Sequence, residues 1–145
     1  MLIECTGDLF SSDCPTLGHG VNTVGVMEGG IAVEFRRRWP DLYEAYAVAC
    51  NTGQLKPGQV FVYEAADRLI LNMATQDGVG RGAARIEWVR ACAEYVAGLG
   101  LSRLAIPRIG CGLGGLQWED VRPVLEETLA PIPRVEVWSL PTTAR

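Results

Sequence analysis

Short apolar runs alternate with longer amphipathic segments along the chain. The apolar runs have the length of strands and are bounded by Gly, Pro or polar residues. They predict strands at 1–5, 16–22, 68–75, 103–109 and 135–140, and one more after a turn within 54–65. The amphipathic segments predict helices at 30–39, 41–50, 83–100 and 117–130, with Asp41 capping the second. This alternation is typical of an α/β protein with a largely parallel central sheet.

Two segments carry clear burial signals. The run at 68–75 is continuously apolar, as in a strand that is buried on both faces. The helix at 83–100 has a wide apolar face that suits packing on a sheet. Its inward side chains are Ile86, Val89, Ala93 and Val96. Three tryptophans also fall on inward faces and are expected in the core: Trp88, Trp118 and Trp138.

The composition is that of a soluble folded domain. Of the 145 residues, 48% are hydrophobic and 21% charged, so we expect one domain over residues 1–145. No apolar run approaches the length of a membrane span, and the first residues lack the pattern of a signal peptide. The five cysteines form no CxxC pair, which favours reduced thiols in the cytoplasm over a zinc site or a disulfide framework. A net charge of -4 argues against nucleic-acid binding driven by electrostatics.

The segment GCGLGG at 110–115 lies between a predicted strand and a predicted helix. Ligands of open α/β sheets bind at the carboxyl ends of strands, and bare backbone lets N–H groups approach an anion closely. A second glycine-bearing loop, in VGVMEGGIAVEF at 24–35, also opens a helix. Two such loops suit a ligand with two linked phosphates. Spacing alone leaves a second interpretation open, in which the glycines only relieve crowding in two turns.

Three segments together resemble the macrodomain family: CTGDLF at 5–10, GHGVNTVGVMEGGIAVEFRRRWP at 18–40 and LAIPRIGCGLGGLQWEDV at 104–121. The nearest likeness is to the branch of the terminal ADP-ribose glycohydrolases and the DNA ADP-ribosyl glycohydrolase antitoxins. The resemblance implies a three-layer α/β/α sandwich with a mixed, largely parallel sheet. It also implies an ADP-ribose site in a cleft along the carboxyl edge of that sheet.

The resemblance assigns a part of ADP-ribose to each loop. Asp8 would receive the adenine amino group, Gly29–Ile31 would face the diphosphate, and Asn22 would approach the distal ribose. The implied ligand-binding residues are Asp8, Leu9, Asn22, Met27, Gly29, Gly30, Ile31, Thr75, Gly110, Cys111, Gly112, Leu113, Gly114, Gly115 and Leu116. From the residues alone, a turn or cap role is favoured for Asp8, and a role in bracing its own loop is the alternative for Asn22.

The catalytic residues of that branch do not carry over. The branch uses a lysine shortly after the central strand and an aspartate in the glycine-rich loop. Here Gln76 stands about where the lysine would be and Gly114 where the aspartate would be, and the only lysine, Lys56, lies in a separate turn. A mechanism through a lysine adduct is therefore not expected.

Hydrolysis without lysine needs a positioned water and charge stabilisation at the anomeric carbon. We expect Asp77 to orient or deprotonate that water and Asn22 to hold the ribose, as the catalytic pair. Glu28 is the second candidate for this carboxylate. A plain turn role for Asp77 is an equally good interpretation of the residue. Arg81 and Arg85 would flank the distal phosphate or precede a helix as solvated charge.

Two further residues invite a nucleophilic interpretation. Cys111 lies in the glycine loop, where a helix amino end can acidify a thiol, and His19 is the only histidine. The spacing does not show that the two meet. A core role for His19 is the favoured interpretation.

These observations predict an ADP-ribose-binding macrodomain that removes ADP-ribose from modified acidic side chains, without metal or cofactor. The expected partner is ADP-ribose or ADP-ribosylated protein, in preference to ADP-ribosylated DNA, and no membrane is involved. Two alternatives stay open: a reader that binds ADP-ribose without turnover, and an enzyme acting on a small ADP-ribose derivative.

Overall fold

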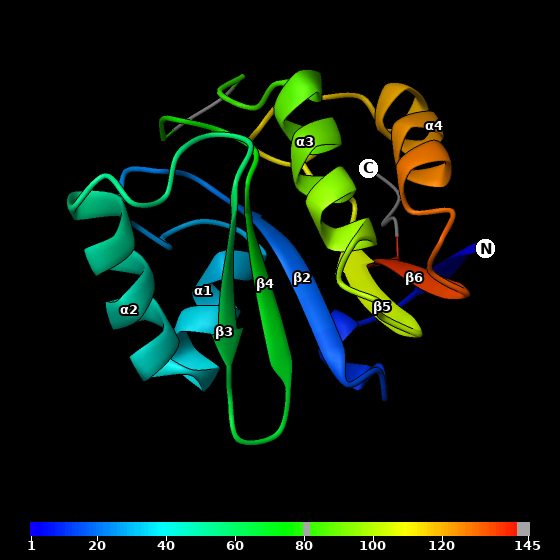
Figure 1. Ribbon diagram of the computed structural model, residues 1–145, viewed down its shortest axis with the longest axis horizontal. Coiled ribbons are helices and arrows are strands. Elements are labelled where there is room, and N and C mark those ends of the chain that lie inside the picture. Colours follow the sequence, from blue (N-terminus) through cyan, green and yellow to red (C-terminus); the bar gives the residue numbers. More distant parts are fainter. Residues whose placement is uncertain (80–81, 142–145) are drawn as a thin grey trace.

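The computed structural model describes residues 1–79 and 82–141, and a six-stranded sheet forms its centre (Figure 1). The strand order is β1-β6-β5-β2-β4-β3, and all neighbours are parallel except β3 and β4. This confirms the expected mixed, largely parallel sheet. The strands are β1 (Leu2–Thr6), β2 (Thr16–Val21), β3 (Val60–Glu64), β4 (Leu69–Ala74), β5 (Arg103–Pro107) and β6 (Arg134–Ser139).

Helices cover both faces of the sheet (Figure 1). On one face lie α1 (Ile31–Arg38) and α2 (Pro40–Asn51), and on the other α3 (Ile86–Ala97) and α4 (Trp118–Thr128). Because side chains alternate along a strand, β4 serves both layers. Leu71 and Met73 pack with residues of α3 and α4, whereas Ile70 packs with residues of α1 and α2. The three-layer α/β/α sandwich and the burial of β4 on both faces are thus confirmed.

One local expectation is wrong, and a second holds only in part, because Trp118 and Trp138 pack against core residues without being fully buried. Pro40 occupies the first turn of α2 with Trp39 at the N-cap, so Asp41 lies inside the helix and does not cap it. The three tryptophans expected in the core are only half-buried. The reason is clear for two of them, whose indole N–H groups need acceptors: Trp118 donates to Glu4 (3.2 Å) and Trp138 to Glu136 (3.0 Å).

The parallel strands β2, β4 and β5 end at the same edge of the sheet. β2 pairs with β4 over its whole length and with β5 through Leu17 and Ala105. The chain therefore leaves the sheet at Asn22, Thr75 and Arg108 on one side of the molecule. Among the residues that the structure describes, no helix has the length and apolar character needed to cross a membrane.

Candidate ligand-binding cleft

Two adjoining cavities lie at this edge. The first, here called the inner chamber, has a volume of about 360 Å³, and the second, the outer groove, about 1190 Å³. The inner chamber is lined by Gly20, Val21, Asn22, Val26, Met27, Glu28, Gly29, Gly30, Ile31, Ala32, Thr75, Gln76, Val79, Pro107, Arg108, Ile109, Gly110, Gly112, Leu113 and Gly114. The outer groove is lined by Gly7, Asp8, Leu9, Phe10, Gly30, Ile31, Glu34, Arg37, Arg38, Pro107, Arg108, Cys111, Gly112, Gly115, Leu116, Gln117, Trp118, Glu119, Trp138, Ser139 and Leu140.

Every residue of the predicted ligand-binding set lines one of these two cavities. The inner chamber takes Asn22, Met27, Gly29, Thr75, Gly110, Leu113 and Gly114, and the outer groove takes Asp8, Leu9, Cys111, Gly115 and Leu116. Gly30, Ile31 and Gly112 line both. The structure thus brings together residues that are more than 100 positions apart in the sequence, although contact with a ligand stays a prediction.

The two glycine-bearing loops meet where the cavities join. A Cβ atom at Gly29 would lie 2.8 Å from Cδ1 of Leu113, so the loops approach closely here and a side chain at position 29 would require Leu113 to shift. An elongated ligand occupying both cavities would cross at this point, between Gly30 and Gly112. This arrangement fits a ligand with two bulky ends and a narrow middle.

Gly30 has a backbone conformation that only glycine adopts easily, with φ 57° and ψ -141°. It is the N-cap of α1, and a Cβ atom there would have no neighbour within 4 Å. Glycine is therefore required here by backbone conformation and not by crowding. Gly30 and Ile31, at the start of α1, line both cavities, and a helix amino end is a favourable environment for an anion.

Asn22 braces the loop that follows β2. Its Oδ1 accepts hydrogen bonds from the backbone N–H of Val24 (3.0 Å) and Gly25 (3.1 Å) and from the hydroxyl of Tyr46 (2.7 Å). Its Nδ2 donates to the carbonyl of Val26 (2.9 Å). The bracing role is therefore present in the structure, while the predicted approach of this amide to a ribose remains untested.

Gln76 and Gly114 lie next to each other in the wall of the inner chamber. Nε2 of Gln76 donates to the carbonyl of Gly78 (2.8 Å), which orients the side-chain amide. A Cβ atom at Gly114 would lie 2.7 Å from Cβ of Ala84, 2.8 Å from the carbonyl oxygen of Gly110 and 3.3 Å from Oε1 of Gln76. The positions at which the resemblance implies lysine and aspartate are thus neighbours, and Gly114 has no room for a side chain.

The candidate acids differ in their placement. Glu28 is exposed and lines the inner chamber. Asp77 is also exposed but does not line either cavity, although its neighbour Gln76 does. The geometry of the unliganded cleft therefore favours Glu28 over Asp77 as a group that reaches the chamber.

His19 and Cys111 occupy different surroundings. The His19 ring stacks on Phe35 (centroids 3.7 Å apart), and Nε2 lies 2.7 Å from Oδ1 of Asn72. Burial lowers the pKa of His19 to about 4, so the ring is neutral at physiological pH. Burial raises the pKa of the Cys111 thiol to about 11, contrary to the acidification that its position in the loop suggested. Cys111 packs against the buried apolar residues between the sheet and the helices α3 and α4. Cys111 and His19 therefore do not form a nucleophilic pair.

Asp8 caps the short 3-10 helix η1 (Leu9–Ser11). One of its carboxylate oxygens accepts a hydrogen bond from the N–H of Phe10 (2.9 Å). The cap alternative therefore describes its local contact. The same residue is exposed in the outer groove, so the cap leaves the predicted adenine contact sterically open.

Arg108 is a cleft residue that sequence reasoning missed. It lines both cavities directly before the glycine loop, a position that could have drawn attention to it as a cation beside an expected anion site. Arg85 lines neither cavity, and its guanidinium lies over the ring of Trp88 (5.5 Å). Arg81 lies outside the described residues.

Ligand atoms of Asp13, Cys14 and Glu136 lie within 4.8 Å of one another, away from the cleft. Both acids already have partners: Asp13 pairs with Arg103, and Glu136 accepts hydrogen bonds from Ser12 (2.7 Å), Arg134 and Trp138. Although burial raises the pKa of Glu136, these hydrogen bonds outweigh it and lower that pKa to about 2. The group is explained by these contacts without a metal.

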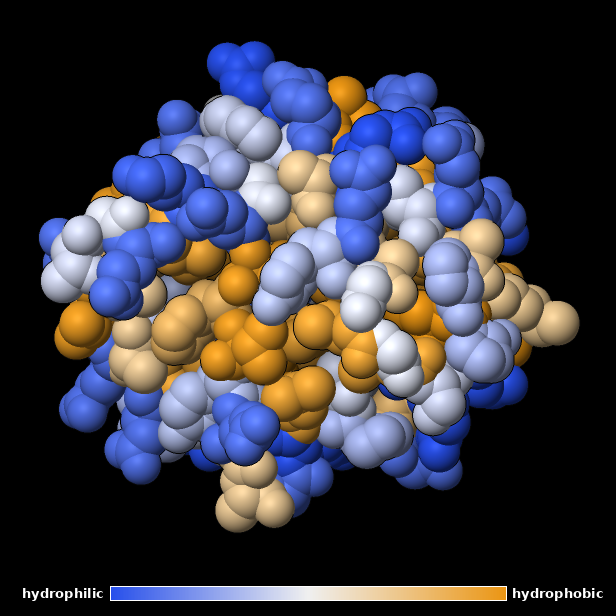
Figure 2. Space-filling model, in the orientation of Figure 1, coloured by the Kyte–Doolittle hydropathy of each residue, from blue (hydrophilic) through white to orange (hydrophobic). Residues whose placement is uncertain are grey.

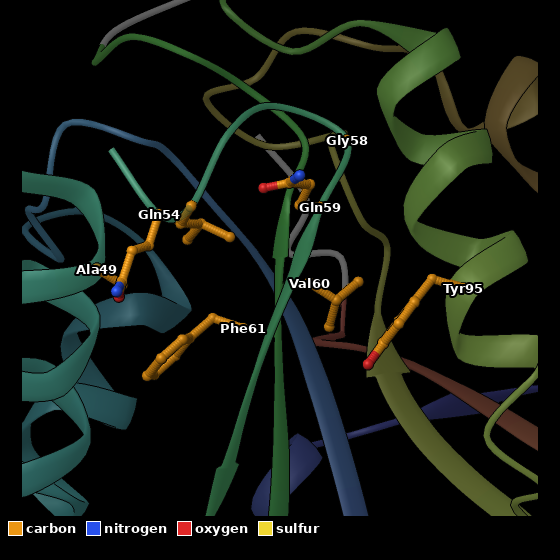
Figure 3. A pocket seen from close by; sticks show the side chains of 8 residues that line it. Ala49, Gln54, Gly58, Gln59, Val60, Phe61 and Tyr95 are labelled. Carbon is orange, nitrogen blue, oxygen red and sulfur yellow. The ribbon is translucent and has the colours of Figure 1, made fainter. Parts of the chain in front are cut away.

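A third cavity, of about 310 Å³, lies beside the edge strand β3 (Figure 3). Figure 3 shows Phe61 and Gln54 on the side of α2 and Tyr95 on α3. Apolar residues gather over this region in Figure 2. Val62 of β3 and Tyr95 of α3 are 36% and 51% exposed. It contains none of the predicted site residues.

Comparison with known proteins agrees with this geometry. A family model described as "Macro domain" matches residues 19–125. A DNA ADP-ribosyl glycohydrolase of Thermus aquaticus is 37% identical over 146 residues, covering 95% of this chain and 40% of that protein. The human ADP-ribose glycohydrolase OARD1 is 32% identical over 128 residues, covering 83% of this chain and 79% of that protein.

A solved structure, "Thermosipho africanus DarTG in complex with ADP-ribose", superposes with a TM-score of 0.86 at 30% identity. The match covers 99% of this chain and 42% of that one. The chain thus spans about two fifths of the length of the DNA ADP-ribosyl glycohydrolases it resembles. With the fold, the cleft and the family match in agreement, this chain belongs to the macrodomain family.

Proposed function

We propose that the cleft binds ADP-ribose, with the adenosine in the outer groove, the distal ribose in the inner chamber and the diphosphate between Gly30 and Gly112. The observation that carries this proposal is the shape of the cleft: two cavities joined where two glycine loops meet. The Thermosipho africanus relative, whose structure is titled as an ADP-ribose complex, supports the choice of ligand.

The proposed activity is hydrolysis of the bond between ADP-ribose and a macromolecule, which the names of the relatives support. The oxygen of water attacks C1″ of the distal ribose while the bond from C1″ to the leaving oxygen breaks. The leaving group takes the electron pair, and a carboxylate accepts the proton of the water. Glu28 and Asp77 are the candidates for that carboxylate, and Asn22 is proposed to position the ribose.

The proposed linkage is an acyl ester on a glutamate or aspartate side chain. A carboxylate is a good leaving group and needs little acid assistance, so this bond makes the smallest demand on a chamber without the lysine and aspartate of the branch. ADP-ribosylated DNA is the second candidate, favoured by the names of the relatives that are 37% and 33% identical.

The test is release of labelled ADP-ribose from four substrates: protein modified on glutamate, on serine or on arginine, and modified single-stranded DNA. We expect the fastest release from the glutamate-modified protein, with no adduct trapped by borohydride. Asn22→Ala, Asp77→Ala and Glu28→Gln each test one candidate. A residue that acts in the transition state slows release while affinity for free ADP-ribose stays within roughly tenfold.

Each of the other outcomes assigns a different function. Faster release from DNA than from protein would identify the second candidate as the substrate. Tight binding of ADP-ribose with no release above a no-enzyme control would exclude the hydrolase and leave a reader. No binding of ADP-ribose would exclude both.

A further inference from the structure

We infer that Arg108 supplies the positive charge for the diphosphate, and that Glu4 holds its guanidinium beside the cleft until the ligand arrives. This inference rests on the proposed function and concerns a residue outside the glycine loops. Arg108 follows β5 directly, and its side chain is 42% exposed. It is the only cation, among the described residues, that lines both the inner chamber and the outer groove.

The charges around the cleft create the need for such a cation. The acids that line the two cavities are Asp8, Glu28, Glu34 and Glu119. Arg37 and Arg38 line the outer groove, but both pair with Glu34 of the same helix. The carboxylate of Glu34 offsets only one of these two arginines, so their positive charge stays in the outer groove, whereas among the described residues the inner chamber has Glu28 as its acid and Arg108 as its cation. A dianionic ligand that passes between the two cavities of a protein of net charge -4 therefore depends on Arg108 for a positive charge at that point. A guanidinium suits this role because its N–H groups match two phosphate oxygens at once.

The contacts of Arg108 are compatible with its release. Nη2 of Arg108 lies 3.1 Å from Oε1 of Glu4, and the guanidinium lies over the ring of Trp118 (5.3 Å). Glu4 also pairs with Arg122 and accepts a hydrogen bond from the indole of Trp118 (3.2 Å). If Arg108 turns to a ligand, Glu4 keeps two donors, so no carboxylate is left without a partner.

Arg122 provides a matched control. It pairs with the same carboxylate as Arg108 but lines neither cavity. Loss of Arg122 therefore removes one guanidinium from Glu4 without removing a charge from the cleft. Adenosine is the matched ligand, since it fills the outer groove but has no phosphate.

The experiment is titration calorimetry of the wild type, Arg108→Gln and Arg122→Gln with ADP-ribose and with adenosine, with thermal melts to verify folding. Arg108→Gln should weaken ADP-ribose binding roughly 10- to 100-fold, the range of a charge-assisted hydrogen bond. Its affinity for adenosine should change less than about threefold, and its ADP-ribose affinity should depend less steeply on salt concentration than that of the wild type. Arg122→Gln should bind both ligands as the wild type does.

Two results would overturn the inference while leaving the proposed function intact. One is wild-type affinity of Arg108→Gln for ADP-ribose. The other is an equal loss for ADP-ribose and adenosine, which would mean that Arg108 supports the groove and does not contact phosphate. If Arg108→Gln does not fold, Arg108→Lys replaces it, with an expected several-fold loss for ADP-ribose only. Failure of the wild type to bind ADP-ribose overturns the proposed function and this inference with it.

Discussion

Gly112 tests the glycine loop at the level of a single residue. A Cβ atom there would have no neighbour within 4 Å, and the residue lines both cavities. Gly112→Glu should therefore fold normally but place a carboxylate where the diphosphate is expected. Because like charges brought together cost several kcal/mol, ADP-ribose affinity in calorimetry should fall more than about 100-fold.

Gly112→Gln is the matched control, since it adds nearly the same volume as Gly112→Glu and carries no charge. It should bind ADP-ribose more weakly than the wild type, because the side chain takes up space expected for the phosphates, but more tightly than Gly112→Glu. Normal binding by a folded Gly112→Glu variant would show that this loop does not hold the phosphates.

Asp8 separates recognition of the base from binding of the phosphates. Asp8→Ala should weaken ADP-ribose binding by about 1–3 kcal/mol, the range of a hydrogen bond to a charged group. It should leave ribose 5-phosphate, which has no adenine, nearly unaffected. Asp8→Asn keeps an oxygen for the N–H of Phe10 and controls for loss of the η1 cap. Equal losses for both ligands in Asp8→Ala would indicate a structural role.

At the level of elements, the loop after β4 and the loop after β5 are packed as one unit. Gln76 and Ala84 form an isolated bridge, and the N–H of Ala84 donates to the carbonyl of Gly114 (3.2 Å). Restoring an aspartate at position 114 therefore requires this unit to open. Gly114→Asp should lower the free energy of unfolding by about 1–3 kcal/mol, the usual cost of an overpacked site, in denaturant titrations.

Gly115→Ala is not a suitable control for Gly114→Asp, because Gly115 has a φ of 86° and a side chain there would strain the backbone. Gly78→Ala is a suitable control, since Gly78 lies in the loop after β4 and no atom of the described residues lies within 4 Å of its Cβ position. Full stability of Gly114→Asp would mean that the loop rearranges easily and that the departure from the family pattern is not enforced by packing.

The elements themselves were largely predictable from sequence, because their signals are local. The apolar run of β4 and the amphipathic face of α3 indicated both type and burial. The N-cap of α2 was predicted wrongly, because Pro40 tolerates the first helical position and Asp41 merely resembles a cap.

At the site, the glycine loops were found by their pattern. The pairing of Arg108 with Glu4 joins residues 104 positions apart, so no local sequence pattern predicts it. The close contact of Gly114 with Gln76 depends on how the two loops pack, which the local sequence does not reveal.

For the whole molecule, His19 predicts how stability depends on pH. Its pKa is about 4 in the folded protein and near 6.5 when unfolded, since burial disfavours the charged ring. Between these values the unfolded chain binds more protons, so stability is fully present above pH 6.5 and is lost as the pH falls toward 4. The loss should reach about 3 kcal/mol, measured by urea titrations from pH 7 to pH 4.

The matched variant for this measurement is His19→Gln, which removes the titrating ring and keeps an N–H group to face Asn72. It should show a flatter profile between pH 4.5 and 6.5, whatever its absolute stability. Glu136 contributes little above pH 4.5, because its stabilising effect is lost only as the pH falls from 4.5, the usual glutamate value, toward its folded pKa of about 2. A wild-type profile that is flat across the window would contradict a neutral, buried His19.

The pairing of β1 with β6 joins the first strand of the chain to the last. Leu2 lies opposite Val135 and Thr6 opposite Ser139, and within residues 1–79 and 82–141 β1 has no other neighbour in the sheet. On a translating ribosome, β2, β4 and β3 can therefore associate before β6 exists. During that time β1 stays unpaired, because its partner strand is synthesised more than 120 residues later. The final docking of this strand pair is thus tied to completion of β6, and Asp8, which lies two residues after the end of β1, is set in place only when synthesis has passed Ser139.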